Sequence, residues 1–407
     1  MTFVSTTPPT RRRWLRPSVM RDHTVPERAS TPLELLFDLC FVVAVAVLAA
    51  ELHHGISAGH APSAAAACLA VFVPIWWAWM SFTWYATAFS HDDALTRLLT
   101  LAQMAGVLAL AATIPAAVAG RMGAFTAAYT LMRLPLILQW LRSARDDASH
   151  RGFALTYAVG SVVAQLVWIA GLTVAGVARW AVYLVALTIE LLTPALAVRR
   201  SPDRVFHPGH IAERYGLFTL IVLGETLLAV TVGLRDAVEG ATSTPSAVRL
   251  TGPVLIIAFA LWWLYFDALG REGLQRNRKA AFVWGYGHYL LFAAIAAIGA
   301  GAQAQLDVLA AHAPAAPTEV HGPEPAVAVA AVGLPLCMVL LVVAWLQHAA
   351  NQRTGSAIPL LIGAAAAGAI TAAGGMLGMA TANALLALVV AAEVMAFQIF
   401  HPAEEPG

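Results

Sequence analysis

Acidic residues in two long apolar segments are the features of this sequence that could carry chemistry. The segment 212–230 is apolar along most of its length, yet it has Glu213 at its start and Glu225 well inside it. In a helix, the separation between positions 213 and 225 corresponds to roughly 18 Å along the axis. An ionised carboxylate in hydrocarbon is costly, so an acid at that depth indicates a function if the segment crosses a membrane.

A similar acidic pair occurs much earlier in the chain, where Glu34 and Asp38 precede a run of apolar residues. Residues i and i+4 lie on the same face of a helix, so these two carboxylates would be stacked. Stacked acids could line a polar pathway or bind a cation. Thr31, Pro32 and Glu34 also match a capping box with proline in the first turn, which gives Glu34 a structural alternative.

Other charged residues lie inside apolar segments and need a partner there. Glu190 and Glu393 fall near the middle of their segments, so, like Glu225, each needs a polar partner or a proton. Arg133 keeps its charge and must reach a carboxylate or water, with Glu225 and Glu190 as candidates.

Two further candidates have simple structural alternatives. His288 lies a few residues into a predicted helix, where a lone histidine is usually a hydrogen-bonded structural residue. Asp267 lies at the end of another predicted helix, where contact with water is enough to stabilise its charge. The predicted polar pathway comprises Glu34, Asp38, Glu213, Glu225, Arg133, Glu190, Asp267, His288 and Glu393.

The composition is that of a membrane protein with many spanning segments. The 407 residues are 59% hydrophobic and 12% charged, with a mean hydropathy of +0.72, whereas soluble domains have about 25% charged residues. A net charge of +1 gives no reason to expect binding to nucleic acid. The cysteines form no CxxC motif. No catalytic or nucleotide-binding motif occurs, so we expect neither an enzyme nor a bound cofactor or metal.

Apolar runs predict an all-α bundle of about twelve transmembrane helices. Residues 1–29 are predicted to be a disordered basic cytoplasmic tail, and 401–407 a short cytoplasmic one. The predicted helices cover about 31–52, 63–86, 97–119, 122–142, 153–177, 180–198, 212–230, 250–269, 281–302, 326–349, 356–376 and 379–400.

The arginines indicate how this bundle is oriented. With this helix count, most arginines outside the helices fall on the side of the two termini. The opposite side has only Arg121, Arg179, Arg235 and Arg249. Because cytoplasmic loops are rich in basic residues, we expect both termini in the cytoplasm.

Motifs recur in the same order along the chain, which predicts two parallel six-helix repeats, 30–200 and 201–400. The second helix has Trp76-Trp77 and the eighth has Trp262-Trp263. The matching motifs are Glu34 with Glu213, Leu134-Pro135-Leu136 with Leu334-Pro335-Leu336, and Glu190 with Glu393.

Three blocks resemble the bacterial low temperature requirement protein A (LtrA) family. They are Glu34-Leu-Leu-Phe-Asp-Leu, the stretch from Glu213-Arg-Tyr-Gly-Leu-Phe to Leu-Gly-Glu225, and Trp262-Trp-Leu-Tyr-Phe-Asp267. The resemblance covers about residues 28–400. It implies a multi-pass protein of the bacterial inner membrane, linked by name to growth in the cold, with no agreed substrate or reaction.

The first functional interpretation is a transporter- or channel-like protein that moves a small solute or ion. The predicted repeat, the buried acids and Arg133 favour it. The alternatives are a structural or regulatory membrane protein for growth in the cold and an integral-membrane enzyme that acts on lipid. The expected partners are the lipid bilayer, an unknown small solute or ion, and a second copy of the chain in a homo-oligomer.

Overall fold

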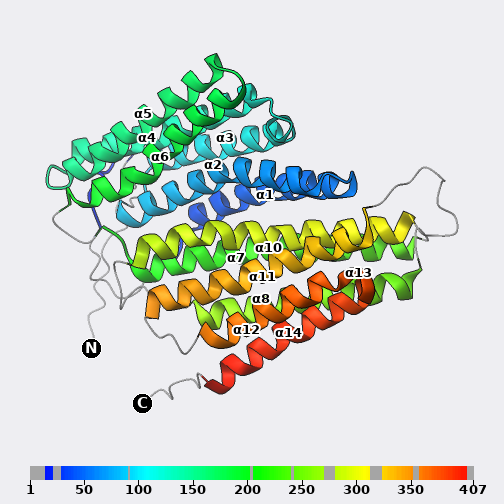
Figure 1. Ribbon diagram of the computed structural model, residues 1–407. Coiled ribbons are helices and arrows are strands. Elements are labelled where there is room, and N and C mark those ends of the chain that lie inside the picture. Colours follow the sequence, from blue (N-terminus) through cyan, green and yellow to red (C-terminus); the bar gives the residue numbers. More distant parts are fainter. Residues whose placement is uncertain are drawn as a thin grey trace. The chain divides into compact units, whose positions relative to one another are not determined.

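The computed structural model describes residues 14–21, 29–89, 92–201, 205–239, 243–269, 280–311, 323–351 and 357–400, and these form helices and connections without a strand (Figure 1). The helices are α1 (Pro32–Ser57), α2 (Ala61–Ala88), α3 (Ala94–Val118), α4 (Met122–Asp146), α5 (Arg151–Ala170), the 3₁₀ helix η1 (Gly171–Thr173), α6 (Gly176–Val198), α7 (Pro208–Val238), α8 (Thr244–Ala268), α10 (Ala280–Ala311), α11 (Pro325–Asn351), α12 (Ile358–Ala372), α13 (Gly374–Leu377) and α14 (Met379–Phe400). The all-α class is confirmed for this part of the chain.

Ten helices in the described ranges are long and apolar enough to cross a membrane, namely α1, α2, α3, α5 with η1, α6, α7, α8, α10, α11 and α14. The chain is therefore a multi-pass membrane protein. Helix α4 is not among the ten and includes Arg133, Arg142 and Arg145. Helix α12 has 15 residues, fewer than the roughly 20 needed to span the hydrocarbon layer. Each predicted segment overlaps a helix, while twelve crossings stay a prediction.

The two tightest connections turn at glycines. Gly176, at the start of α6, has φ of 61°, and Gly378, between α13 and α14, has φ of 76°. Other residues rarely adopt this left-handed conformation because their Cβ clashes with the backbone. The predicted helix 356–376 is divided in the structure: α12 ends at Ala372, and the four-residue α13 precedes the turn.

Contacts divide the chain into two units, each considered by itself below. Unit 1 comprises Met1–Pro26, Ser81–Val107 and Thr126–His207, and unit 2 comprises Glu27–Met80, Leu108–Phe125 and Pro208–Gly407. Helices α2, α3 and α4 contribute residues to both units. The boundaries of the predicted repeats, 30–200 and 201–400, remain a prediction.

Neutral polar side chains join two helices in unit 2. Gln305 of α10 and Asn383 of α14 exchange hydrogen bonds, with Nε2 to Oδ1 at 3.1 Å and Nδ2 to Oε1 at 2.6 Å. Their other amide hydrogens go to the backbone carbonyls of Ala328 and Leu250, at 3.1 Å each. Both side chains are completely buried. This satisfied pair is typical of the contacts that hold membrane helices together.

Close backbone contacts in unit 2 depend on glycine. A Cβ on Gly301 of α10 would overlap the carbonyl group of Ala331 on α11, and one on Gly299 would lie 3.2 Å from the backbone of Thr226 on α7. Small residues let membrane helices approach this closely. By contrast, Gly252 of α8 has open space around the position of a Cβ.

We expect Gly301→Ala to destabilise the protein by about 1–3 kcal/mol, because a backbone atom would have to move. Gly224→Ala in α7 is the matched control, because a Cβ there meets open space, and it should be neutral or slightly stabilising, since alanine favours helix more than glycine does. Unfolding of both variants in detergent would be compared with the parent. Equal stability of the two variants would contradict the tight α10–α11 contact.

Candidate functional site

The start of α1 is fixed by two carboxylates from different helices. Thr31 caps the helix: its Oγ1 accepts a hydrogen bond from the Glu34 N–H at 3.3 Å, and its own N–H donates to Glu34 Oε2 at 2.6 Å. The capping box is therefore formed. One residue earlier, the Ser30 N–H lies 3.1 Å from both carboxylate oxygens of Glu213, which belongs to α7. Glu213 thereby joins the start of α1 to α7.

One turn deeper, a buried ion pair joins the same two helices. Arg214 Nη2 of α7 donates to Asp38 Oδ1 of α1 at 2.5 Å, and the side chains are 0% and 2% exposed. The same Oδ1 accepts a hydrogen bond from Trp79 Nε1 of α2 at 2.7 Å. Glu34 Oε1 lies 3.9 Å from Arg214 Nη1 and 3.4 Å from His210 Nε2. We call Glu34, Asp38, Trp79, His210 and Arg214 the α1–α7 charge cluster.

The helical repeat explains how this cluster forms. Glu34 and Asp38 are four residues apart on α1, and His210 and Arg214 are four residues apart on α7. Each pair therefore lies on one face of its helix. An acidic face meets a basic one, so the spacing of the charges sets the register between α1 and α7.

Aromatic rings enclose the cluster. The Trp79 ring centroid lies 4.8 Å from that of Tyr215 and 4.3 Å from that of Phe218, both on α7. Tyr215 in turn packs at 4.8 Å from Trp284 and 4.9 Å from His288 of α10. All of these side chains are at most 1% exposed. With water excluded, the effective dielectric constant is low and the attraction between Asp38 and Arg214 is strong.

His288 has a structural environment within this shell. Its Nδ1 lies 2.7 Å from the Trp284 carbonyl oxygen, and its Nε2 lies 3.1 Å from the Tyr265 hydroxyl. A carbonyl can only accept, so Nδ1 carries the proton and Nε2 accepts from Tyr265. Both ring nitrogens are thus satisfied by the protein.

Several buried carboxylates in unit 2 are only partly satisfied. Asp38 Oδ2 and Glu393 Oε2 are buried without a hydrogen-bond partner among the described residues. Glu225 is 9% exposed, and in the same part of the chain it forms no hydrogen bond or ion pair. Gly363 of α12 admits the Glu393 carboxylate, because a Cβ there would overlap Oε1. In contrast, exposed Asp267 accepts a hydrogen bond from Gln398.

A second buried cluster lies in unit 1. Glu190 of α6 accepts hydrogen bonds from Tyr129 Oη of α4 at 2.7 Å and from Gln165 Nε2 of α5 at 2.9 Å. Arg133, one turn after Tyr129, interacts electrostatically with Glu190. Its Cζ lies 5.9 Å from the centroid of the Tyr129 ring. We call Tyr129, Arg133, Gln165 and Glu190 the Arg133 cluster.

The predicted site residues therefore separate into different environments. Of the two partners considered for Arg133, Glu190 is the one that lies beside it in unit 1. In unit 2, no hydrogen bond or ion pair joins the described Glu225, Asp267, His288 and Glu393 to the charge cluster. Within the described ranges, no three histidine, cysteine, aspartate or glutamate side chains are grouped so that they could hold a metal ion.

Sequence reasoning missed several residues of these clusters. His210 carried a usable signal, since its spacing from Arg214 matches that of Glu34 from Asp38. Trp79 was not among the predicted site residues, but it is fully buried and donates a hydrogen bond to Asp38. By contrast, Trp262 and Trp263 are 47% and 48% exposed, which is usual for aromatic side chains at a membrane interface.

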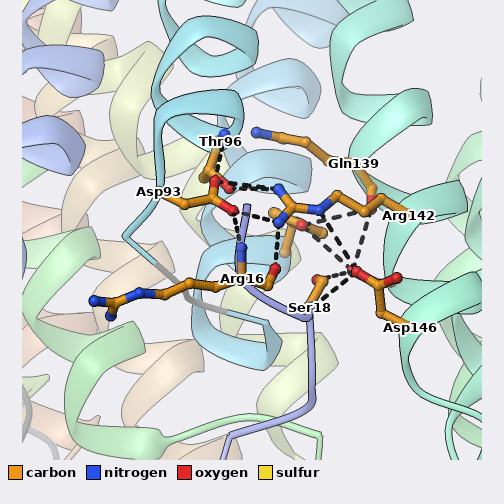
Figure 2. A network of polar contacts seen from close by, with 9 residues as sticks. Arg16, Ser18, Asp93, Thr96, Gln139, Arg142 and Asp146 are labelled. Atoms are coloured by element: carbon orange, nitrogen blue, oxygen red, sulfur yellow. Dashed lines mark hydrogen bonds and ion pairs between the residues drawn. The ribbon is translucent and has the colours of Figure 1, made fainter. Parts of the chain in front are cut away.

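A third polar network holds residues 14–21, which differ from the predicted disordered tail. The Arg16 N–H donates to Asp93 Oδ2 at 2.8 Å, and the Ser18 and Met20 N–H groups donate to Asp146 and Asp147 at 3.0 and 2.9 Å. In Figure 2, the Arg142 side chain reaches between Asp93 and Asp146, whereas that of Arg16 points away. We call residues 14–21 the strap.

The acids that hold the strap are stabilised in their charged form. Burial alone would raise the pKa of Asp93, but hydrogen bonds from Arg142, Arg16 and Thr96 outweigh burial and keep that pKa well below its usual value. Burial would also raise the pKa of Asp147, but hydrogen bonds from Ser149, Met20 and His150 outweigh burial and lower that pKa. A lowered folded-state pKa gives stability that is present above the unfolded pKa and lost as pH falls.

Removing one member of the Asp38–Arg214 pair should lower the stability of the protein much more than removing both. We expect Arg214→Met to destabilise the protein by about 3–5 kcal/mol, because Asp38 would be left buried without its partner. The double variant Asp38→Leu/Arg214→Met should recover much of this loss. Unfolding in detergent would measure both, with Arg235→Met in the exposed Arg235–Asp236 pair as the control. Additive losses would contradict the coupling.

The strap should stay docked between pH 5 and 8 and be released only below about pH 4, where the aspartates that bind it take up protons. Hydrogen exchange of the Arg16, Ser18 and Met20 amides measures this. Asp93→Ala and Asp147→Ala should each reduce protection roughly tenfold at pH 7, whereas Asp236→Ala, an exposed acid of unit 2, should not. A loss of protection between pH 8 and pH 5 would contradict this assignment.

Comparison with known proteins agrees with the motifs that build the charge cluster. The family model for the bacterial low temperature requirement A protein (LtrA) matches residues 29–396. A curated relative, Uncharacterized protein RA0937 of Rhizobium meliloti (strain 1021), is 29% identical over 301 residues, which cover 68% of each chain. The family match includes Glu34, Asp38, His210 and Arg214 and nearly the whole helical region. The chain therefore belongs to the bacterial low temperature requirement A (LtrA) family.

Proposed function

We propose that this LtrA-family protein is a transporter- or channel-like protein that moves a small solute or ion across the bacterial inner membrane. It has twelve crossings in two parallel six-helix repeats, with both termini in the cytoplasm. The buried acids of α1 and α7 line its polar pathway. The lipid bilayer surrounds the protein. We also propose that it associates into a homo-oligomer.

The observation that carries the proposal is the incomplete satisfaction of Asp38. Its Oδ1 accepts hydrogen bonds from both Arg214 and Trp79, while its buried Oδ2 has no partner in the described part of the chain. A buried polar atom without a partner costs free energy and needs a functional explanation. A proton or a cation passing along α1 would satisfy Oδ2.

Helix packing alone does not require these charges. In the same unit, Gln305 and Asn383 join α10 and α14 with neutral amides whose hydrogen bonds are complete. Such contacts cost less than a buried carboxylate. Glu225 lies on α7, eleven positions beyond Arg214, and is buried without a hydrogen bond or ion pair to a described residue. Cargo or a coupled proton is therefore the better explanation for the acids of α1 and α7.

Two corresponding hairpins support the repeat. Near the end of the first predicted half, Glu190 of α6 faces Gln165 of α5. Near the end of the second, Glu393 of α14 faces Gly363 of α12. In both hairpins, the last helix thus presents a glutamate to the helix before it. Pro135 and Pro335 also lie inside the corresponding helices α4 and α11.

A structural role is the second candidate, and a specific observation favours it. Glu34, Glu213 and Glu190 accept hydrogen bonds that fix helix starts or join helices. In a protein that only holds its helices together, every charge would serve in this way. The two functions differ in what the removal of a poorly satisfied acid does.

The test uses purified protein in proteoliposomes, with flux screened across inorganic ions and small metabolites. Glu225→Gln preserves size and removes the charge. For transport, we expect it to abolish flux, or the pH dependence of flux, while the amount of folded protein stays the same. Asp236→Asn is the matched control, because this acid of the same helix has an exposed side chain, lies outside the predicted pathway and should leave flux unchanged.

The opposite result would favour the structural role. In that case, Glu225→Gln would lower thermal stability or yield, and the parent protein would support no flux of any solute in the screen. A stable Glu225→Gln variant with unchanged flux at every pH would remove Glu225 from the mechanism.

A further inference from the structure

Arg133 is a buried cation that forms no ion pair with a residue that the structure describes. Arg133 belongs to α4 and is 4% exposed. Its Nε and Nη1 have no hydrogen-bond acceptor among the described residues. A guanidinium cannot lose its proton to escape this environment. Unsatisfied buried donors on a permanent charge are costly, so an acceptor from outside the chain is expected beside them.

The neighbours of Arg133 define the chemistry of that acceptor. Gln165 Oε1 is also buried without a partner in the described ranges, which adds a hydrogen-bond acceptor to the donors of Arg133. Aromatic rings lie next to these polar groups: Trp168 packs 5.6 Å from Tyr129 and 4.7 Å from Tyr183, measured between ring centroids. A planar guanidinium matches a planar carboxylate, and aromatic walls suit a short alkyl group.

The charge balance limits the occupant to one negative charge. Arg133 supplies one positive charge, and Glu190 supplies one negative charge when it is ionised. The groups that face Glu190 are Tyr129 and Arg133 from α4 and Gln165 and Trp168 from α5. A bound monoanion would leave a net charge of about −1 in this buried site, whereas protonation of Glu190 would restore neutrality.

We propose that the Arg133 cluster binds a small monocarboxylate together with one proton. The carboxylate accepts hydrogen bonds from Arg133, and the proton passes from solvent to the Glu190 carboxylate, where it forms a neutral acid. Gln165 Oε1 is an additional acceptor for a hydroxyl group on the ligand. This inference concerns binding in unit 1 and does not depend on the transport proposed above.

The test is calorimetry of the full-length protein in nanodiscs with propionate as the probe. Propionate should bind roughly tenfold more tightly for each unit by which pH falls from 8 to 6, because one proton is taken up. Titrations in two buffers with different ionisation enthalpies count that proton directly. Propionamide, which has nearly the same shape without the charge, should not bind.

Three variants assign the effect to named side chains. Arg133→Gln should weaken propionate binding at least about tenfold, whereas Arg145→Gln, which removes an exposed charge from the same helix, should not. Glu190→Gln resembles the protonated acid, so it should bind propionate without dependence on pH. If Arg133→Gln does not fold, Arg133→Lys replaces it, and the loss of the planar fork should still weaken binding.

Several outcomes would overturn the proposal. If folded parent protein binds no propionate, water is the occupant of the cluster. If chloride competes as well as propionate does, the cluster is a general anion site and not a site specific for carboxylates. Binding without proton uptake would remove Glu190 from the proposal. A protein that binds propionate but supports no flux would refute transport and leave this site intact.

Discussion

The attraction between Asp38 and Arg214 in a region without water is the interaction on which the arrangement of α1 and α7 depends. Each charge alone would be very costly there, so the two helices must keep the register that brings the charges together. The capping box of Thr31 and Glu34 and the contact from Ser30 to Glu213 fix the chain on one side of the pair. The rings of Trp79, Tyr215 and Phe218 keep water away on the other.

The molecule uses polar groups in two ways that differ in how completely they are satisfied. Gln305 and Asn383 bond to each other and to backbone carbonyls, which suits a permanent contact between helices. Asp38 and Arg133 each retain buried atoms without a partner in the described residues. A buried polar atom without a partner costs free energy, and these are the atoms that the proposed cargo and ligand would satisfy. Asp38 therefore both joins α1 to α7 through Oδ1 and keeps Oδ2 available for the proposed function.

The helices were predictable from sequence because long apolar runs, Thr31 with Glu34, and turn glycines such as Gly378 are local signals. The Asp38–Arg214 pair was not predicted, because it joins residues 176 positions apart and the sequence alone does not say which helices pack together. Trp79 was missed for the same reason. Arg133 had two candidate partners, and only packing within unit 1 places Glu190 beside it.

The distance along the chain between Asp38 and Arg214 has a consequence for biosynthesis. Helix α1 leaves the ribosome first, whereas its partner arginine emerges only when α7 is made. During that interval, Asp38 has no Arg214 to neutralise it, and an ionised aspartate within a spanning helix disfavours insertion. We therefore expect Asp38 to be protonated, or α1 to be incompletely inserted, until Arg214 is available. Its final placement is a late event, completed when the second half of the chain arrives.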